Sequence, residues 1–359
     1  MRAAVCYEYG KPLVVEEIDI DPPMKGEVKV RLAATSVCHS DVSIIRGLWG
    51  GSLPVLAGHE AAGIVEDAGE DVTLARPGDT VVVSLLRSCG RCFYCVAGFP
   101  YACEAEFALD SESRLRNKKG EFIHRGLRTA AFAEYVIVHQ SQVAKIPDEM
   151  PMDRAALLPC AVITGVGAVV NTAKVRPGDS VVVIGTGGVG LNSVQGALLA
   201  GAHVIIAVDI LDTKLRSARS FGATHTVNAR DNDAVKAVKE MTSGRGAAFV
   251  FVTVGSSEAA RQAFEMTGKR GTVIIIGQPE IDATVSFSID SMIKGERRVM
   301  GSPMGSGRLS LDIPWLVSLY QQGRLKLDEL ITERYPLEKI NEAIESLERG
   351  NALRNVILF

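Results

Sequence analysis

The chain has 359 residues, of which 47% are hydrophobic and 23% are charged, and its formal net charge at pH 7 is −3. This balance is typical of a soluble globular protein, and the length favours two domains over one core. The weak charge excludes nucleic acid or an acidic membrane surface as the main partner.

Short β-type runs separated by Gly, Pro and Asp fill the first 150 residues. The N-terminal run, residues 1–5, lacks the long apolar stretch of a secretory signal and is predicted to be a strand. The spacing predicts an antiparallel, barrel-like domain. Residues 105–125 are charged and irregular, which predicts a surface loop. The clearest further strands are residues 27–32, 63–66, 79–83 and 133–138.

From residue 180 onward, strands alternate with helices, which predicts a doubly wound parallel sheet and an α/β class. The stretch 181–208 has no Asp, Glu, Lys or Arg and could mimic a membrane span, but six glycines interrupt it, together with Asn192, Ser193 and Gln195. It is better interpreted as strand, loop, helix and strand. The later chain is predicted to be helical at 313–322 and 337–349 and to end in a strand at 355–359. Within the α/β part, the expected strands are 181–184, 203–208, 248–252 and 272–276, and the expected helices are 189–199 and 213–221.

A glycine-rich loop, residues 185–190 (GTGGVG), follows the first of these strands directly and matches G-x-G-x-x-G. Such glycines permit a tight turn and close approach of the backbone to a pyrophosphate at a helix N-terminus. Asp209 closes the second strand, where a carboxylate binds both ribose hydroxyls and repels a 2′-phosphate, so NAD is favoured over NADP. Ile210 follows without an adjacent arginine, in agreement. The alternative is a glycine-rich turn in a non-binding domain. The expected loop contacts are Gly185, Gly187, Gly188, Val189 and Gly190.

The chain has seven cysteines, an odd number, and four of them fall within fifteen residues. Without an export signal, this spacing favours metal binding over a disulfide framework and indicates a cytoplasmic protein. Four thiolates predict a closed, structural zinc site. Two disulfides or an iron–sulfur cluster remain as alternatives. The four residues are Cys89, Cys92, Cys95 and Cys103.

A second candidate metal set is dispersed along the chain and consists of Cys38, His59 with Glu60, and Cys160. Spacing supports this set only weakly, because a single buried cysteine commonly behaves as a small hydrophobic residue. From the residues alone, a metal site and a structural role are equally favoured.

In combination, these residues resemble the zinc alcohol dehydrogenase branch of the medium-chain dehydrogenase/reductase family. The resemblance covers nearly the whole chain and rests on ordered motifs that include the cysteine lobe and the dinucleotide loop. The other motifs are residues 26–28 (GEV), 38–41 (CHSD), 58–63 (GHEAAG), Cys160 with 164–165 (TG), 337–343 (LEKINEA) and the tail around Arg354.

The resemblance implies roles for the dispersed set. It implies a catalytic zinc with an open position for substrate and Glu60 as an alternate ligand. Asp41 would fix the histidine ligand, and Ser40 would accept the substrate proton. The cysteine lobe corresponds to the structural zinc of the family, which gives two Zn²⁺ per chain. The implied catalytic ligands are Cys38, His59 and Cys160.

The resemblance also implies contacts with NAD(H). His39 would meet the pyrophosphate, and Arg354 would reach it from the C-terminal segment. For Lys214, a solvated helix face is the alternative. The remaining positions implied to contact the cofactor are Thr164, Val189, Ile210, Val254 and Ile276.

By the same resemblance, a GroES-like β-barrel catalytic domain takes residues 1–161 and 304–359, with the structural-zinc lobe at 88–104. It flanks a Rossmann coenzyme domain of residues 162–303. Relatives are dimers or tetramers, often paired through an edge strand near residues 299–301, although Pro303 lies close by. A homo-oligomer is therefore expected, with no nucleic acid and no membrane as partner.

The substrate is expected to be a small alcohol or aldehyde of apolar character. Leu48, Trp49 and Leu85 would line an apolar pocket, although Trp49 could simply pack the loop. This favours an aryl or medium aliphatic alcohol. The loop 46–52 lacks the acidic residues of the glutathione-dependent formaldehyde enzymes. Ser43 stands where many members carry a relay histidine, and it cannot act as a base near neutral pH.

The sequence therefore predicts zinc-dependent, reversible oxidation of a primary or secondary alcohol by hydride transfer to NAD. The alternative enzyme is a reductase of aldehydes or activated double bonds with the same fold. A non-catalytic binding protein is disfavoured by the complete set of site residues.

Overall fold

The computed structural model describes residues 1–350 and 352–359, and the chain divides into two compact units. The first unit comprises Met1–Cys160 and Arg308–Phe359, and the second comprises Ala161–Gly307. The sequence-based division differs at both boundaries, by the single residue Ala161 at the first and by residues 304–307 at the second, all of which it placed in the first unit. Residues 304–307 belong to the second, because a Cβ on Gly167 would lie 2.5 Å from the carbonyl oxygen of Gly305, and Thr172 Oγ1 lies 2.8 Å from Ser306 Oγ.

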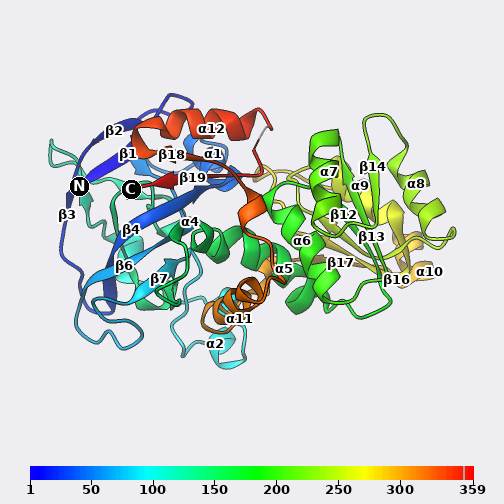
Figure 1. Cartoon of the computed structure of the whole chain (residues 1–359), viewed down its shortest axis with the longest axis horizontal. Helices are drawn as coiled ribbons and strands as arrows, with labels where there is room; N and C mark the ends of the chain where they lie inside the picture. The colour runs from blue at the N-terminus through cyan, green and yellow to red at the C-terminus, as the bar shows by residue number, and fades with distance from the viewer. Residues whose placement is uncertain (351) are drawn as a thin grey trace. The chain divides into compact units, whose positions relative to one another are not determined.

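The first unit is built on one large sheet and two small ones (Figure 1). Strand β4 (Glu27–Val37) is central to the large sheet, and its apolar side chains alternate inward, as a half-buried strand requires. Along the large sheet the order is β11 (Val143–Lys145), β7 (Thr80–Val83), β6 (Ala61–Ala68), β4, β19 (Arg354–Leu358) and β18 (Ile331–Pro336), while β10 (Tyr135–His139) also pairs with β4. The four-stranded sheet has the order β2 (Val14–Glu17), β1 (Arg2–Cys6), β5 (Val55–Leu56) and β9 (His124–Arg125), and β3 (Asp19–Ile20) pairs with β8 (Leu115–Arg116).

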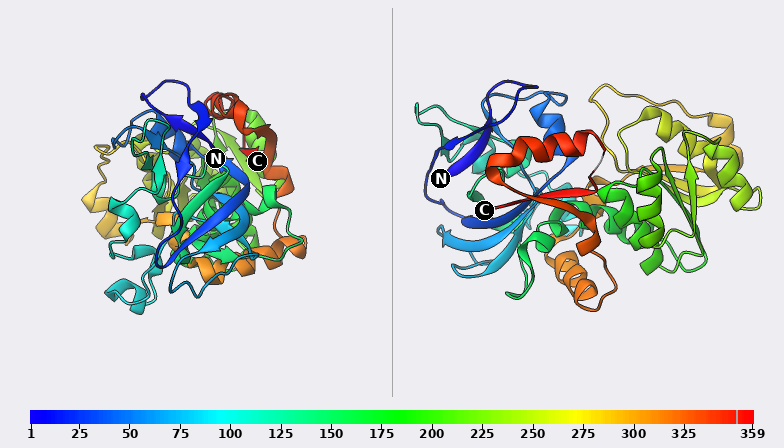
Figure 2. Two further views of the ribbon diagram at one scale, coloured as in Figure 1. Left: turned by 90° about the vertical axis from the view of Figure 1, so that its left-hand side faces the viewer. Right: turned by 45° about the horizontal axis from the view of Figure 1, so that its top comes forward.

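Most strand pairs of the first unit are antiparallel, as the sequence predicts. The pairs β18–β19 and β5–β9 are parallel. Helix α12 (Ile340–Glu348) packs against β18 and β19 (Figures 1 and 2), with its apolar residues at helical spacing. The other α-helices of this unit are α1 (His39–Ile45), α2 (Phe93–Val96), α3 (Ala108–Ser111), α4 (Met152–Ala155) and α11 (Leu309–Gln321).

The prediction of a surface loop at residues 105–125 is only partly right. Much of the segment is irregular and exposed, but it also forms α3, β8 and β9 and buries Leu109, Leu115 and Ile123. The many charged residues of this segment suggested that it is exposed to solvent, but some of them form ion pairs inside the protein. Arg114 donates Nη2 to Glu27 Oε1 at 2.8 Å and Nε to Oε2 at 3.1 Å, and both side chains are buried.

The second unit contains one six-stranded sheet in which every neighbouring pair is parallel. This strand order is that of a doubly wound dinucleotide-binding fold, so the predicted class is confirmed. The strand order is β14 (His225–Asn228), β13 (Val204–Asp209), β12 (Ser180–Ile184), β15 (Ala247–Val252), β16 (Thr267–Ile275) and β17 (Arg298–Gly301). The helices are α5 (Ile163–Gly167), α6 (Gly188–Leu199), α7 (Asp212–Ser220), α8 (Ala234–Met241), α9 (Ser257–Met266) and α10 (Ile289–Gly295).

One helical stretch, Met152–Ala173, is long and apolar enough to cross a membrane by length and composition. Of its most apolar window, 83% is buried inside the protein, as in a core helix of a globular fold. The sequence analysis predicted no helix there. The stretch 181–208 forms β12, α6 and most of β13, as predicted.

Candidate functional site

Four chemistry-bearing side chains that are far apart in the sequence converge in the first unit. One ligand atom from each of Cys38, His59, Glu60 and Cys160 lies within 4.8 Å of the others, and all four residues are buried. Cys38 follows β4 as the N-cap of α1, and His59 and Glu60 immediately precede β6. Cys160 lies in the π-helical turn Leu158–Val162.

The carboxylate of Asp41 organises this cluster. It accepts the backbone N–H of Cys38 at 3.1 Å and of Gly58 at 2.9 Å, and its Oδ1 lies 2.8 Å from His59 Nδ1. Gly58 has φ +92, and a Cβ there would lie 2.5 Å from a backbone nitrogen, so the loop requires glycine. The bond to Nδ1 leaves Nε2 as the free ring nitrogen, which lies 3.2 Å from Cys160 Sγ.

The donor set fits zinc. Three protein ligands, two sulfurs and one imidazole nitrogen, form one of the known catalytic zinc sets and leave a fourth position open. In tetrahedral geometry the sulfur and nitrogen ligands are separated by roughly 3.6 Å, close to the 3.2 Å between Nε2 and Cys160 Sγ. The thiol of Cys160 donates to Cys38, which lowers the pKa of Cys38 well below its ordinary value and raises the pKa of Cys160. Zinc binding would require both sulfurs as thiolates and would release the shared proton.

An ion pair that the sequence pattern does not reveal lies next to the cluster. Arg354 donates Nη1 to Glu60 Oε1 at 3.0 Å and to the carbonyl of Val37 at 3.3 Å, while its Nε is buried with no hydrogen-bond partner among residues 1–350 and 352–359. Burial raises the pKa of Glu60 to about 7, and the Arg354 charge opposes that rise. The two residues are 294 positions apart, so no local pattern could reveal the pair. The pyrophosphate contact of Arg354 remains a prediction.

The four-cysteine lobe also gathers its ligand atoms within 4.8 Å of one another. Its cysteines are free rather than disulfide-bonded, so two disulfides are excluded. The sulfurs of Cys92 and Cys103 lie 3.9 Å apart, close to the roughly 3.8 Å expected for two thiolates on a tetrahedral zinc. Backbone N–H donation lowers the pKa of Cys92 to about 6. Four sulfurs with no open position fit a structural zinc.

The glycine-rich loop of the second unit joins β12 to α6, whose N-cap is Gly187. Gly185 has φ +86, and a Cβ on Gly190 would lie 1.8 Å from the Gly185 carbonyl oxygen, so both positions require glycine. A cavity of about 710 Å³ begins at this loop and continues toward α8 and α9. The predicted cofactor residues that line it are Gly185, Asp209, Ile210 and Val254.

The described geometry can be compared with known proteins. Residues 24–148 match the family model "Alcohol dehydrogenase GroES-like domain", and residues 188–322 match "Zinc-binding dehydrogenase". An NDMA-dependent alcohol dehydrogenase from Amycolatopsis methanolica is 39% identical over 99% of this chain and 98% of its own length. The chain belongs to the zinc-dependent alcohol dehydrogenases of the medium-chain dehydrogenase/reductase family. As a member of that family it is an oxidoreductase that uses zinc and NAD(H) to oxidise alcohols.

Other alcohol dehydrogenases agree with this assignment. An S-(hydroxymethyl)glutathione dehydrogenase from Saccharomyces cerevisiae is 40% identical over 99% of this chain and 95% of its own length. The solved benzyl alcohol dehydrogenase from Acinetobacter calcoaceticus has a TM-score of 0.93 and 32% identity, and the alignment covers 100% of this chain and 99% of that one. The predicted fold class is therefore confirmed.

The remaining predicted site residues of this alcohol dehydrogenase are placed as follows. On α1, His39 is exposed and Ser40 is half-buried. Of the residues predicted to line the substrate pocket, Trp49 and Leu85 are half-buried, and Leu48 is 48% exposed. Their roles toward a substrate remain predictions.

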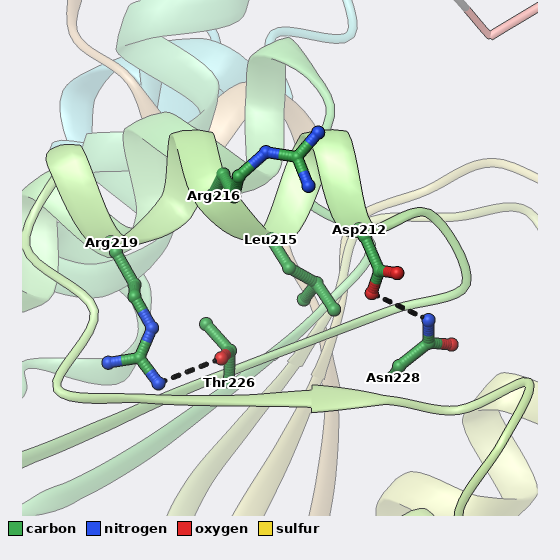
Figure 3. A pocket seen from close by; sticks show the side chains of 6 residues that line it. All are labelled: Asp212, Leu215, Arg216, Arg219, Thr226 and Asn228. Carbon is green, nitrogen blue, oxygen red and sulfur yellow. Dashed lines mark hydrogen bonds between the residues drawn. The ribbon is translucent and has the colours of Figure 1, made fainter.

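In the second unit, Thr164 donates Oγ1 to Met304 Sδ at 3.6 Å, and Ile276 donates its N–H to the carbonyl of Val252. Lys214 lies half-buried on α7 and does not line the 710 Å³ cavity. A separate groove of about 300 Å³ lies between α7 and β14 (Figure 3) and was not predicted.

Proposed function

We propose that this alcohol dehydrogenase acts on apolar primary or secondary alcohols, aryl or medium aliphatic, and transfers hydride reversibly to NAD⁺. The observation that carries the proposal is the convergence of Cys38, His59 and Cys160 around one point in the first unit. The benzyl alcohol dehydrogenase among the similar structures supports the aryl class.

The metal ligands, Asp41 and Ser40 have separate roles in this reaction. Cys38, His59 and Cys160 would hold a zinc ion, which when bound would supply a Lewis acid that lowers the pKa of the alcohol. Asp41 keeps the proton on His59 Nδ1, so that Nε2 offers its lone pair. Ser40 accepts the alcohol proton on its Oγ and passes its own proton onward, because a hydroxyl both accepts and donates.

Proton exit from Ser40 is inferred to proceed to water. Ser43 lies one helical turn further along α1 and cannot act as a base near neutral pH. The two serines form a matched pair on one helix. Ser40→Ala is expected to lower kcat by about 10²–10⁴-fold, while Ser43→Ala changes it little. Equal kcat values for both variants would contradict the assignment.

The preference for NAD is assigned to Asp209, whose carboxylate would accept both ribose hydroxyls and repel a 2′-phosphate.

A second candidate substrate comes from the S-(hydroxymethyl)glutathione dehydrogenase relative. The loop 46–52 has no acidic residue to meet the amino group of glutathione, so this substrate is disfavoured.

A substrate panel tests the proposal in both directions. Benzyl alcohol, 1-hexanol, glycerol and S-(hydroxymethyl)glutathione are oxidised with NAD⁺ or NADP⁺, and the matching aldehydes are reduced with NADH or NADPH. We expect the highest kcat/KM for the two apolar alcohols with NAD⁺. Preference for glycerol, for the glutathione adduct or for NADP⁺ would refute the substrate or cofactor assignment.

We further infer a homo-oligomer in which the second unit pairs through β17, the edge strand of its sheet. Beside this edge, α10 exposes Ile289 at 74% and Ile293 at 73%, one helical turn apart. Ile293→Glu is expected to lower the mass measured by light scattering. Leu311→Glu, at an apolar position of the first unit that is 60% exposed, serves as control. An unchanged mass for Ile293→Glu would refute this interface. A cytoplasmic location remains a proposal that rests on the cysteine spacing of the sequence.

A further inference from the structure

Thr186 occupies the variable position between the first two glycines of the dinucleotide loop. It is buried, with 0% of its surface exposed. Its backbone N–H lies 2.7 Å from Asp209 Oδ2, and its hydroxyl donates to the same oxygen at 3.0 Å. The side chain therefore points at the carboxylate and away from solvent.

The other oxygen of the same carboxylate is held as well. Asp209 Oδ1 accepts the backbone N–H of Ile210 at 2.8 Å and of Leu211 at 3.1 Å. Four donors of the chain, two on each oxygen, therefore orient the carboxylate before any ligand arrives. Three of the four donors are backbone groups that any residue except proline supplies. The hydroxyl of Thr186 is the one donor that depends on the choice of side chain.

The held carboxylate lines the 710 Å³ cavity, whereas Thr186 stands behind it and does not line the cavity. An unheld Asp side chain at the end of β13 would rotate about its χ angles and average its charge over several positions. A hydrogen bond to an ionised acceptor opposes that rotation more strongly than one between neutral groups. The hydroxyl thus acts on the ligand site only through Asp209.

We propose that Thr186 is a positioning residue for cofactor selection. Its hydroxyl holds Asp209 so that the carboxylate faces the two ribose hydroxyls of NAD and keeps its charge where a 2′-phosphate would lie. This inference rests on the proposed role of Asp209 in binding the adenosine ribose. Thr186 itself touches no reacting atom.

The loop offers a matched control. Thr253 donates its hydroxyl to the carbonyls of Ile184 at 3.1 Å and Gly185 at 2.7 Å, so it supports the same turn without touching Asp209. Thr186→Val and Thr253→Val each remove one hydroxyl at nearly constant volume. Thr186→Ser restores the donor. A purely structural role predicts the same behaviour for both valine variants.

Dissociation constants of NADH and NADPH, measured by fluorescence titration of the zinc-loaded enzyme, test the proposal together with thermal unfolding. We expect Thr186→Val to weaken NADH binding about 3–10-fold, the range for one hydrogen bond, and to leave NADPH binding unchanged or stronger. The KM for NAD⁺ rises while kcat stays nearly constant. Thr186→Ser restores the wild-type NADH/NADPH ratio, and Thr253→Val lowers Tm without changing that ratio.

Two other outcomes overturn the proposal in different ways. If the wild type prefers NADH but Thr186→Val keeps the same NADH/NADPH ratio, the positioning role fails and the proposed role of Asp209 survives. If the wild type prefers NADPH, the proposed cofactor preference fails, and the inference fails with it.

Discussion

The buried ion pair between Arg354 and Glu60 gives the sharpest stability prediction. Their side chains are 4% and 0% exposed, and the Nη1–Oε1 distance is 3.0 Å. Removal of the guanidinium in Arg354→Met leaves a buried carboxylate without its partner, which destabilises a fold by about 3–5 kcal/mol. Glu60→Gln keeps the shape and removes the charge, so we expect a smaller loss of about 1–3 kcal/mol.

The double variant separates the ion pair from the general effect of substitution. Because each single change already removes the attraction, the two losses should not add, and the coupling energy should reach about 1–3 kcal/mol. Urea unfolding of all four proteins at about pH 8.5, above the pKa of Glu60 and with zinc present, measures this cycle. Lys145→Met at the partly exposed pair with Asp79 is the control, for which about 0–1 kcal/mol is expected. Additive losses, or equal losses for Arg354→Met and Lys145→Met, would refute the reasoning.

Three further predictions concern the metal sites and pH. In Asp41→Asn, an amide group replaces the carboxylate that accepts the N–H groups of Cys38 and Gly58 in the wild type. The affinity for the catalytic zinc should therefore fall about 10–100-fold, as measured by competition with a chelator, while the cysteine lobe keeps its metal. Wild-type affinity at that site would contradict the role of Asp41. Cys92→Ser should reduce the zinc content from about two to one per chain and lower Tm while a folded, zinc-bound catalytic site remains; loss of both metals would argue against independent sites. Burial alone would raise the pKa of Asp153, but bonds from Arg154 and Arg334 hold that pKa below its ordinary value. Its contribution to stability is therefore present above about pH 4 and lost as the pH falls through the lower pKa of the folded state. Asp153→Asn should destabilise the enzyme at pH 7 by about 1–3 kcal/mol and by much less near pH 2, as chemical unfolding at the two pH values would reveal; equal losses would contradict the assignment.

The sequence was informative where chemistry restricts the choice of residue. Cysteines at short spacing predicted the lobe, because few structures other than metal sites use four thiols in fifteen residues. The glycine loop was predictable for a similar reason, since a Cβ at Gly190 would meet backbone only 1.8 Å away. Four strands (β12, β13, β15 and β16) and two helices (α6 and α7) of the second unit followed from apolar runs of suitable length, and their ends shifted by a few residues at most, apart from β16, which begins at Thr267. The apolar runs did not predict β14, α5, α8, α9 and α10.

Long-range complementarity was not predictable. The bond between Arg354 and Glu60 joins positions 294 apart, and the pair between Arg114 and Glu27 joins positions 87 apart. In both cases a charged residue looked like a surface or ligand-binding group, because charge alone does not tell whether a partner is available in the fold. The misplaced boundary at residues 304–307 has a similar origin, since Gly305 joins the second unit through its close contact with Gly167.

Asp41 and Asp209 illustrate how the same device serves two ligands. Each carboxylate is anchored by backbone N–H groups, from Cys38 and Gly58 in one case and from neighbouring residues of the β13 turn in the other. Almost any sequence supplies backbone donors, so these donors orient the carboxylate but do not determine which ligand it serves. That decision falls to the side chain each carboxylate meets. The histidine beside Asp41 places its Nε2 3.2 Å from Cys160 Sγ, and the buried hydroxyl beside Asp209 is the group that we propose holds the carboxylate toward a cavity. Exchange of one side chain at such a position should therefore change ligand choice while the surrounding loop remains folded.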